Sequence, residues 1–130
     1  MNSQIHIQKC VNSRVIDLDF DDIPLGKTFT DHMFICSYES GQWQSPKIVP
    51  LSPVLTHPAA MAFHYGQAIF EGMKATVDGH GTPLLFRPEA NAKRLNFSAR
   101  RLGMPEFPEA LFVEALKTVS YTHLRAHETR

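Results

Sequence analysis

The order of strand-forming and helix-forming segments along the chain restricts its fold more than any other feature. Phe29 to Tyr38 is rich in strand formers, and Trp43 to Val49 can return as a partner strand after a turn at Ser40-Gly41. Pro46 lacks an N–H group, so it must lie at a sheet edge or a bulge. Helical patterns come later in the chain. Strands followed by helices that pack on them predict an α+β fold with a mixed or antiparallel sheet.

The clearest helical pattern begins at Pro88. Proline suits the first position of a helix, Glu89 complements the helix dipole, and Gly103 with Pro105 ends the pattern. A second helix is expected from Pro108 onwards. The apolar positions recur at helical spacing, and they are Ala92, Leu95, Ala99 and Leu102 in the first helix and Leu111, Phe112, Ala115 and Leu116 in the second.

Shorter elements are expected between the first strands and the helices. Prolines at positions 50, 53 and 58 divide the chain into extended pieces and loops. One or two helical turns are expected from His64 to Glu71, stopped by Gly72. Two short strands are predicted at Met73–Val77 and Pro83–Phe86, on either side of the hairpin signal Asp78-Gly79-His80-Gly81.

Length and charge exclude several classes of protein. The 130 residues suffice for one ordinary domain, and 13 basic and 13 acidic side chains cancel. Such a balance provides no long-range attraction to nucleic acid or to an acidic membrane surface. No apolar run approaches the roughly 18 residues of a membrane span, and no signal peptide is recognisable. We expect a cytoplasmic protein in which Cys10 and Cys36 are free thiols.

The last twelve residues differ in origin from the rest in our interpretation. The run from Val119 to Thr129 can be back-translated, codon by codon, into a transposon-end sequencing adapter read in one frame. We therefore interpret 119–130 as a tail that is not native and exclude it from fold reasoning. The division that follows is an arm at 1–27 and an incomplete domain at 28–118.

No metal site is expected. His123 and His127 are four residues apart with Glu128 adjacent, but the glutamate is misplaced for a zinc-binding HExxH pattern, and the pair lies in the tail. His57 and His64 have no cysteine or carboxylate at ligand spacing. Ordinary polar contacts are the expected role of these two histidines.

Two sequence blocks carry the functional signal. The first runs from His57 to Ala75 and contains His64-Tyr65-Gly66 and Phe70-Glu71-Gly72-Met73-Lys74, and the second reads Leu85-Phe86-Arg87-Pro88-Glu89-Ala90-Asn91-Ala92-Lys93-Arg94-Leu95. In this order and at this spacing they resemble the HYG, FEG and RP–N–RL motifs of branched-chain amino-acid aminotransferases. The segments Phe29-Thr30-Asp31-His32-Met33 and Gly41-Gln42-Trp43 to Pro50-Leu51 are also similar to that family. The resemblance covers roughly residues 24 to 117.

The resemblance implies the small N-terminal domain of a fold-type IV pyridoxal-phosphate enzyme, cut before its catalytic lysine. The implied reaction is amino transfer between L-leucine, L-isoleucine or L-valine and 2-oxoglutarate, in a homodimer or a larger homo-oligomer. None of the lysines sits in the catalytic-lysine context of the family, so the fragment itself is expected to be inactive; they are Lys9, Lys27, Lys47, Lys74, Lys93 and Lys117.

By its position in the second block, Arg94 is the residue that the family uses to bind the cofactor phosphate. A planar guanidinium satisfies a phosphate dianion with two parallel charge-assisted hydrogen bonds. The alternative is a solvated helix arginine, like Arg100 or Arg101.

Four residues of the first block are candidates for substrate binding. The resemblance places Tyr65 and Phe70 around the substrate, where aromatic rings supply apolar pocket walls; ordinary core packing is the alternative. Gly72 allows a bend or a close backbone approach. Lys74 matches a basic position near the active site, although a structural ion pair is the more common role. Glu71 is interpreted as structural.

Three other functions stay open. A D-amino-acid aminotransferase and an aminodeoxychorismate lyase share the implied fold. A non-catalytic module that binds a partner through exposed strand edges belongs to a different class. The sequence blocks that face cofactor and substrate in the family favour the branched-chain enzyme.

Overall fold

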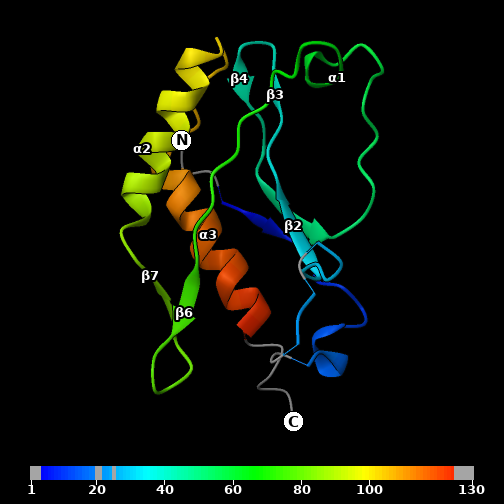
Figure 1. Ribbon diagram of the computed structural model, residues 1–130, viewed down its shortest axis with the longest axis vertical. Coiled ribbons are helices and arrows are strands. Elements are labelled where there is room, and N and C mark those ends of the chain that lie inside the picture. Colours follow the sequence, from blue (N-terminus) through cyan, green and yellow to red (C-terminus); the bar gives the residue numbers. More distant parts are fainter. Residues whose placement is uncertain (1–3, 20–21, 25, 125–130) are drawn as a thin grey trace.

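The computed structural model describes residues 4–19, 22–24 and 26–124, apart from the side chains at 16 and 122–124. Small paired strands precede two long helices that pack beside them (Figure 1). The described elements are β1 (His6–Ile7), η1 (Val15–Asp17), β2 (His32–Ile35), β3 (Tyr38–Glu39), β4 (Gln42–Trp43), β5 (Lys47–Pro50), α1 (Met61–Tyr65), β6 (Ala75–Val77), β7 (Pro83–Leu85), α2 (Pro88–Arg101) and α3 (Glu109–Leu124). The predicted combination of helix and sheet is confirmed.

The central sheet is mixed. Strand β5 lies between β1 and β2, parallel to β1 and antiparallel to β2. Its Ile48 is fully buried and pairs with both neighbours. Strand β1 comes from the segment that the sequence assigned to an arm, so part of that arm belongs to the sheet.

The predicted strand at Phe29–Tyr38 is two short strands. Ile35 pairs with Lys47 in the β2–β5 ladder, whereas Tyr38 pairs with Trp43 in the β3–β4 ladder. The register therefore shifts by one residue, with an extra residue on the side that contains Pro46. A proline cannot donate to a ladder, and a bulge accommodates it. The predicted position of Pro46 at an edge or bulge is confirmed.

Helix α3 covers the sheet and forms the main apolar cluster. Ile5 and Ile48 from the sheet side meet Leu111 and Ala115 of α3, and Phe34, Cys36, Phe107 and Val119 pack around them. The helix thus continues through Val119, beyond the point where we expect the native sequence to end. The adapter origin of 119–130 stays a prediction, and residues 125–130 lie outside the described part of the chain.

Helix α2 begins at Pro88 and is followed by Gly103 at a φ of 65°, as predicted. Ala92 and Ala99 of the predicted apolar positions are buried, whereas Leu102 lies beyond the helix and is 44% exposed. The sequence pattern also missed the buried Asn96. Its amide accepts a hydrogen bond from the Phe107 backbone N–H and donates one to the Phe107 carbonyl, both at 2.8 Å. This pair of bonds attaches the α2–α3 connection to α2.

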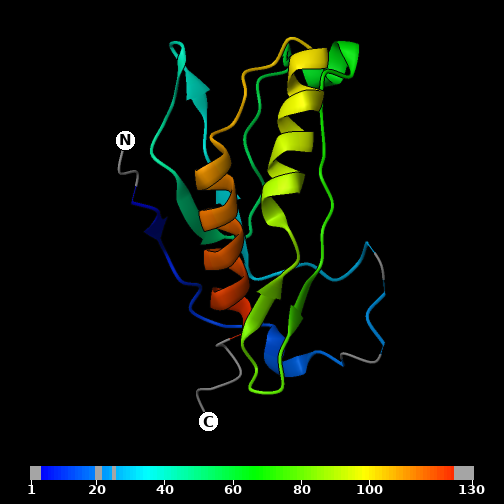
Figure 2. The ribbon, with the colours of Figure 1, turned by 90° about the vertical axis from the view of Figure 1, so that its left-hand side faces the viewer.

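The helical turns expected from His64 to Glu71 lie earlier in the chain. Helix α1 spans Met61–Tyr65 and ends at Gly66, which adopts a left-handed conformation with a φ of 62°. The chain then runs in an extended course alongside α2 towards β6 (Figure 2). The predicted β6–β7 hairpin is confirmed, with the Asp78 carboxylate accepting hydrogen bonds from two backbone N–H groups of the turn.

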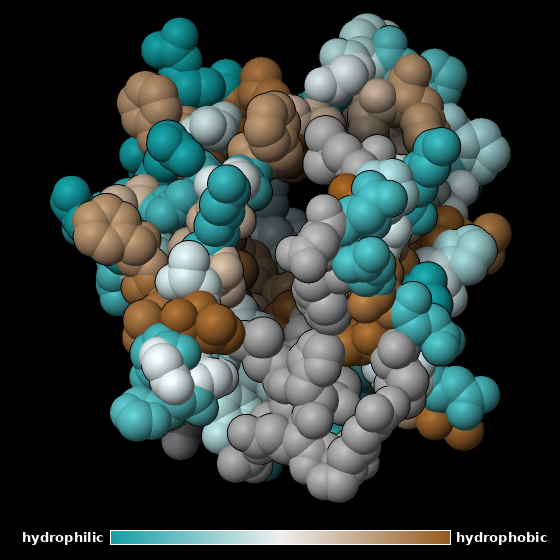
Figure 3. Space-filling view, turned by 60° about the horizontal axis from the view of Figure 1, so that its bottom comes forward, coloured by the Kyte–Doolittle hydropathy of each residue, from teal (hydrophilic) through white to brown (hydrophobic). Residues whose placement is uncertain are grey.

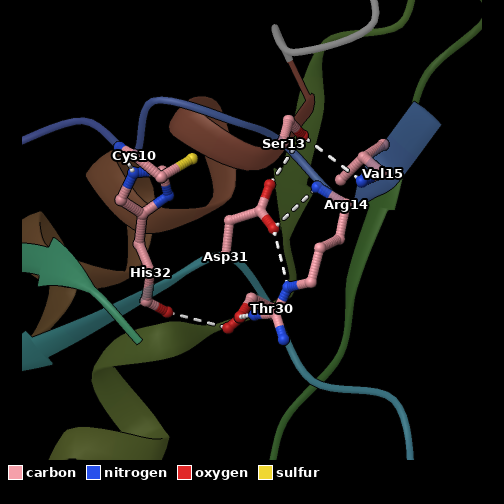
Figure 4. A network of polar contacts seen from close by, with 7 residues as sticks. All are labelled: Cys10, Ser13, Arg14, Val15, Thr30, Asp31 and His32. Atoms are coloured by element: carbon pink, nitrogen blue, oxygen red, sulfur yellow. Dashed lines mark hydrogen bonds and ion pairs between the residues drawn. The ribbon is translucent and has the colours of Figure 1, made fainter. Parts of the chain in front are cut away.

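The N-terminal segment is held by a buried carboxylate. Asp31, 6% exposed, accepts hydrogen bonds from the Ser13 hydroxyl at 2.6 Å and from the backbone N–H and Nε of Arg14 at 3.0 and 3.2 Å (Figure 4). Burial raises the pKa of Asp31, but the bonds from Ser13 and Arg14 outweigh burial and lower it. The contact therefore stabilises the ionised carboxyl.

Replacing Asp31 with asparagine tests this attachment. The substitution removes the negative charge and places an amide N–H group, itself a donor, against the donors of Ser13 and Arg14. We therefore expect the free energy of unfolding to fall by about 1–3 kcal/mol. Urea denaturation measures the loss. The exposed Asp22 lies in the same segment, and Asp22→Asn serves as the control with a change within about 0.5 kcal/mol. Equal stability of the two variants would contradict the prediction.

Many large apolar side chains lie on the surface of the described chain. Hydrophobic groups sit beside hydrophilic ones over the face shown in Figure 3. The most exposed are Val11, Leu55, Phe63, Tyr65, Phe70 and Phe86. Apolar surface that is not covered in a monomer favours association.

We expect the isolated 130-residue chain to self-associate or to show poor solubility. The physical reason is the exposed aromatic surface together with short strand edges. Sedimentation velocity across a concentration series measures the association, and binding of a hydrophobic dye reports the exposed surface. A concentration-independent monomer with one sharp calorimetric transition is the contrary result.

Candidate functional site

The two sequence blocks lie side by side in the structure. Gln67 Nε2 donates to the Leu102 carbonyl at 2.8 Å, Arg94 pairs with Glu71, and Asn91 Nδ2 donates to the Gly72 carbonyl at 3.4 Å. From Gln67 to Gly72 the extended chain advances about 16 Å. From Leu102 back to Asn91 the helix also advances about 16 Å. The first block therefore lies antiparallel along α2 with matching lengths.

Glu71 is the centre of the contact between the blocks. Its Oε2 accepts from Arg94 Nε at 2.8 Å, and its Oε1 accepts from Arg94 Nη2 and from Asn91 Nδ2, the latter at 3.0 Å. Asn91 and Arg94 are three residues apart on α2, so they point from the same side of the helix. One carboxylate is thus bound by two side chains of the second block.

The burial of the two partners differs strongly. The Glu71 side chain is 6% exposed, whereas that of Arg94 is 67% exposed. The hydrogen bonds from Arg94 lower the pKa of Glu71 from its ordinary 4.5 to about 2; burial acts in the opposite direction, and Asn91 adds to the lowering. The same ion pair raises the pKa of Arg94. Both groups are therefore charged at neutral pH.

Arg94 retains the capacity to bind an anion. Its two bonds to Glu71 use Nε and Nη2 and leave Nη1 uninvolved. Because the side chain is largely exposed, the outer part of the fork can reach a phosphate group from solvent. Arg94 is a largely exposed helix arginine that differs from Arg100 in having a buried carboxylate partner, and its role in phosphate binding stays a prediction.

Tyr65 and Phe70 lie at the surface. Tyr65 ends helix α1 and is 79% exposed, and Phe70 precedes Glu71 in the extended segment and is 92% exposed. Ordinary core packing, the alternative for both residues, is therefore wrong for the described chain. Two rings this exposed are available to face a ligand or another part of a larger protein.

Gly72 and Lys74 continue the same extended segment. The Gly72 carbonyl contacts Asn91, which places the glycine beside α2. A Cβ atom added at Gly72 would meet nothing within 4 Å, so the close approach suggested by the sequence is not made by the described residues. Lys74 is exposed one residue before β6.

His57 and His64 make local polar contacts, as predicted. The Ala59 backbone N–H donates to His57 Nδ1 at 3.0 Å, and His64 Nε2 lies 2.9 Å from the Pro58 carbonyl. In the described ranges, no group of three or more histidine, cysteine, aspartate or glutamate side chains is placed to hold a metal. None of the helices within those ranges is long and apolar enough to cross a membrane.

A wide groove lies elsewhere on the molecule. It has a volume of about 1190 Å³ and runs between the β3–β4 hairpin and the α2–α3 connection, beside Trp43, Arg100 and Glu106. Its lining includes none of the site residues predicted from the sequence. The contact between the two blocks, and not this groove, is therefore the candidate site.

Sequence reasoning missed the part played by Glu71 and Asn91. Glu71 was interpreted only as structural, and Asn91 was noted only as part of the second sequence motif, with no role assigned to it. One signal was present, because Glu71 is the only carboxylate between His57 and Ala75. If such a carboxylate becomes buried in the fold, it needs a cationic or hydrogen-bonding partner.

The chain is similar in sequence to several known proteins. Over 99 residues, 75% of the chain, it is 48% identical to branched-chain-amino-acid transaminase 1 of Bacillus subtilis. It is 46% identical over 100 residues to branched-chain-amino-acid aminotransferase 2 of the same organism, and 47% identical over 93 residues to the branched-chain-amino-acid aminotransferase of Mycolicibacterium smegmatis. The chain is related to the branched-chain-amino-acid aminotransferases. The resemblance carried by the two blocks is thus confirmed.

The relationship covers part of each relative. The aligned region corresponds to 28%, 28% and 25% of the length of these three proteins. No protein-family model matches the chain. The chain thus spans about a quarter of the length of these relatives.

The ion pair predicts a specific dependence of stability on pH. Because the folded pKa of Glu71, about 2, lies below its ordinary 4.5, the pair stabilises the fold above pH 4.5 and loses that effect as the pH falls towards 2. We expect Glu71→Gln to lower the free energy of unfolding at pH 7 and to converge with the original chain near pH 2. Urea denaturation at several pH values measures the difference.

Glu106→Gln provides the matched control. It removes a carboxylate that pairs with another α2 arginine, Arg100, in an ion pair whose two side chains are 55% and 47% exposed. Such pairs contribute little, so this variant should differ from the original by less than about 1 kcal/mol. A Glu71→Gln effect that is the same at pH 3 and pH 7 would reject the pH dependence.

Proposed function

We propose that this chain belongs to an enzyme that transfers amino groups between L-leucine, L-isoleucine or L-valine and 2-oxoglutarate with pyridoxal phosphate. The similarity to branched-chain-amino-acid aminotransferases supports the activity. The observation that carries the site is the attachment of the first block to the second by Glu71, Asn91 and Arg94. In this proposal, residues 28–118 form part of the small domain of a fold-type IV enzyme.

Arg94 binds the cofactor phosphate in this proposal. Its guanidinium is permanently charged, is held at one edge by Glu71 and is exposed at the other. A phosphate dianion accepts hydrogen bonds from such a fork with a defined orientation. The residue thereby determines where the cofactor lies relative to the first block.

Tyr65 and Phe70 form apolar walls for the substrate side chain. Their large exposed areas suit contact with branched aliphatic groups, which bind by burial of apolar surface. Gly72 leaves open space beside the wall, since a Cβ there would meet nothing. Lys74 presents a positive charge to a substrate carboxylate.

Chemistry at the substrate Cα requires groups outside this chain. When bound, pyridoxal phosphate supplies an electron sink for cleavage of the Cα–H bond. The lysine that moves the proton belongs to the remaining part of the enzyme. The residues of this chain bind and orient, and a cytoplasmic homodimer is the assembly we propose for the complete protein.

A chimaeric enzyme tests the proposed activity. The segment of this chain that matches Bacillus subtilis transaminase 1 replaces its counterpart in that complete enzyme. We expect activity with L-leucine and 2-oxoglutarate, and at least about a hundredfold less with D-alanine, because a pocket built for one enantiomer misplaces the Cα–H of the other. Arg94→Ala in the same chimaera is the site control. Activity with D-alanine alone would favour a D-amino-acid aminotransferase and reject the proposal.

A further inference from the structure

We propose that Glu71 is a positioning residue that holds the Arg94 guanidinium in the orientation in which it receives a phosphate group. The inference rests on the proposed function, because it assigns a role to Glu71 in the same site. Glu71 does not contact the anion in this account. Its effect on phosphate binding passes through Arg94.

The geometry of the ion pair supports positioning. The Glu71 carboxylate accepts hydrogen bonds from Nε and Nη2, which lie on the same edge of the Arg94 guanidinium. Two such bonds fix the orientation of the guanidinium plane as well as its position. Asn91 donates to the same carboxylate and to the Gly72 carbonyl, so the carboxylate is itself held. An arginine bound in this way has lost much of its rotational freedom before any ligand arrives.

The distribution of exposure supports the same role. Glu71 is almost completely buried beneath a guanidinium that is mostly exposed. An ion pair that served only to attach the extended segment would not require the cation to remain at the surface. Here the carboxylate occupies the inner edge of the fork and leaves Nη1 for an outside partner.

Charge alone predicts the opposite effect. A carboxylate next to Arg94 cancels part of its attraction for a phosphate dianion, so removing Glu71 would tighten phosphate binding if only Coulomb energy mattered. If orientation is decisive, removing Glu71 weakens binding although the site becomes more positive. The sign of the change therefore separates the two accounts.

The experiment uses the apo form of the complete chimaeric enzyme and two probes that differ only in the phosphate group. Dissociation constants for pyridoxal phosphate and for pyridoxal are measured by absorbance titration. We expect Glu71→Ala and Glu71→Gln to raise the dissociation constant for pyridoxal phosphate about tenfold, which corresponds to a coupling typical of side chains in direct contact. Binding of pyridoxal should change less than about twofold, since it lacks the group that Arg94 contacts.

A double-mutant cycle isolates the action through Arg94. In an Arg94→Ala background, Glu71→Ala should cause no further loss of affinity for pyridoxal phosphate, because the guanidinium that Glu71 orients is gone. Glu106→Gln, which removes the partner of Arg100 on the same helix, should leave both constants unchanged. Glu71→Gln keeps the volume of the side chain, so this variant is used for the same measurements if the Glu71→Ala variant does not fold.

The outcomes separate this inference from the proposed function. If Arg94→Ala leaves the affinity for pyridoxal phosphate unchanged, the cofactor assignment itself fails. If Arg94→Ala weakens the binding of pyridoxal phosphate but Glu71→Ala tightens it, the positioning role is overturned. The role is also overturned if Glu71→Ala weakens the binding of pyridoxal and of pyridoxal phosphate equally. A loss of affinity that persists in the Arg94→Ala background also overturns it.

Discussion

The bond between the buried Glu71 carboxylate and the side chains of Arg94 and Asn91 is the contact on which the candidate site depends. It attaches a segment without regular structure to the side of helix α2. Such a segment makes few backbone bonds of its own, so side-chain contacts must hold it. Because that segment carries Tyr65, Phe70 and Gly72, the same contact places the substrate candidates relative to the phosphate candidate.

The rest of the fold provides a rigid base for this contact. Asn96 binds both backbone groups of Phe107, and the rings of Phe34 and Trp43 meet Phe107 edge to face. These contacts attach the α2–α3 connection to α2, to β2 and to β4. Helix α2 therefore presents Asn91 and Arg94 from a fixed surface, as a binding site requires.

Local chemistry made several parts of the fold predictable. Pro88 marks the start of helix α2 because proline suits the first helical position, and Gly103 follows its end because glycine accepts a left-handed conformation. Pro46 marks a bulge because it cannot donate to a ladder. The helix expected at His64–Glu71 was misplaced, since Gly66 ends helix α1 early and the side chains of Gln67 and Glu71 then hold the extended segment against α2 and its C-cap residue Leu102.

The sequence by itself determined the order of elements, the two motif blocks and their relationship to branched-chain-amino-acid aminotransferases, since these depend on residue type and spacing. Only the tertiary structure decided that Glu71 joins the blocks and that Tyr65 and Phe70 lie exposed. Glu71 and Arg94 are 23 residues apart, and no local pattern specifies which distant charge a carboxylate will meet. That pairing follows from the packing of an extended segment along a helix of matching length.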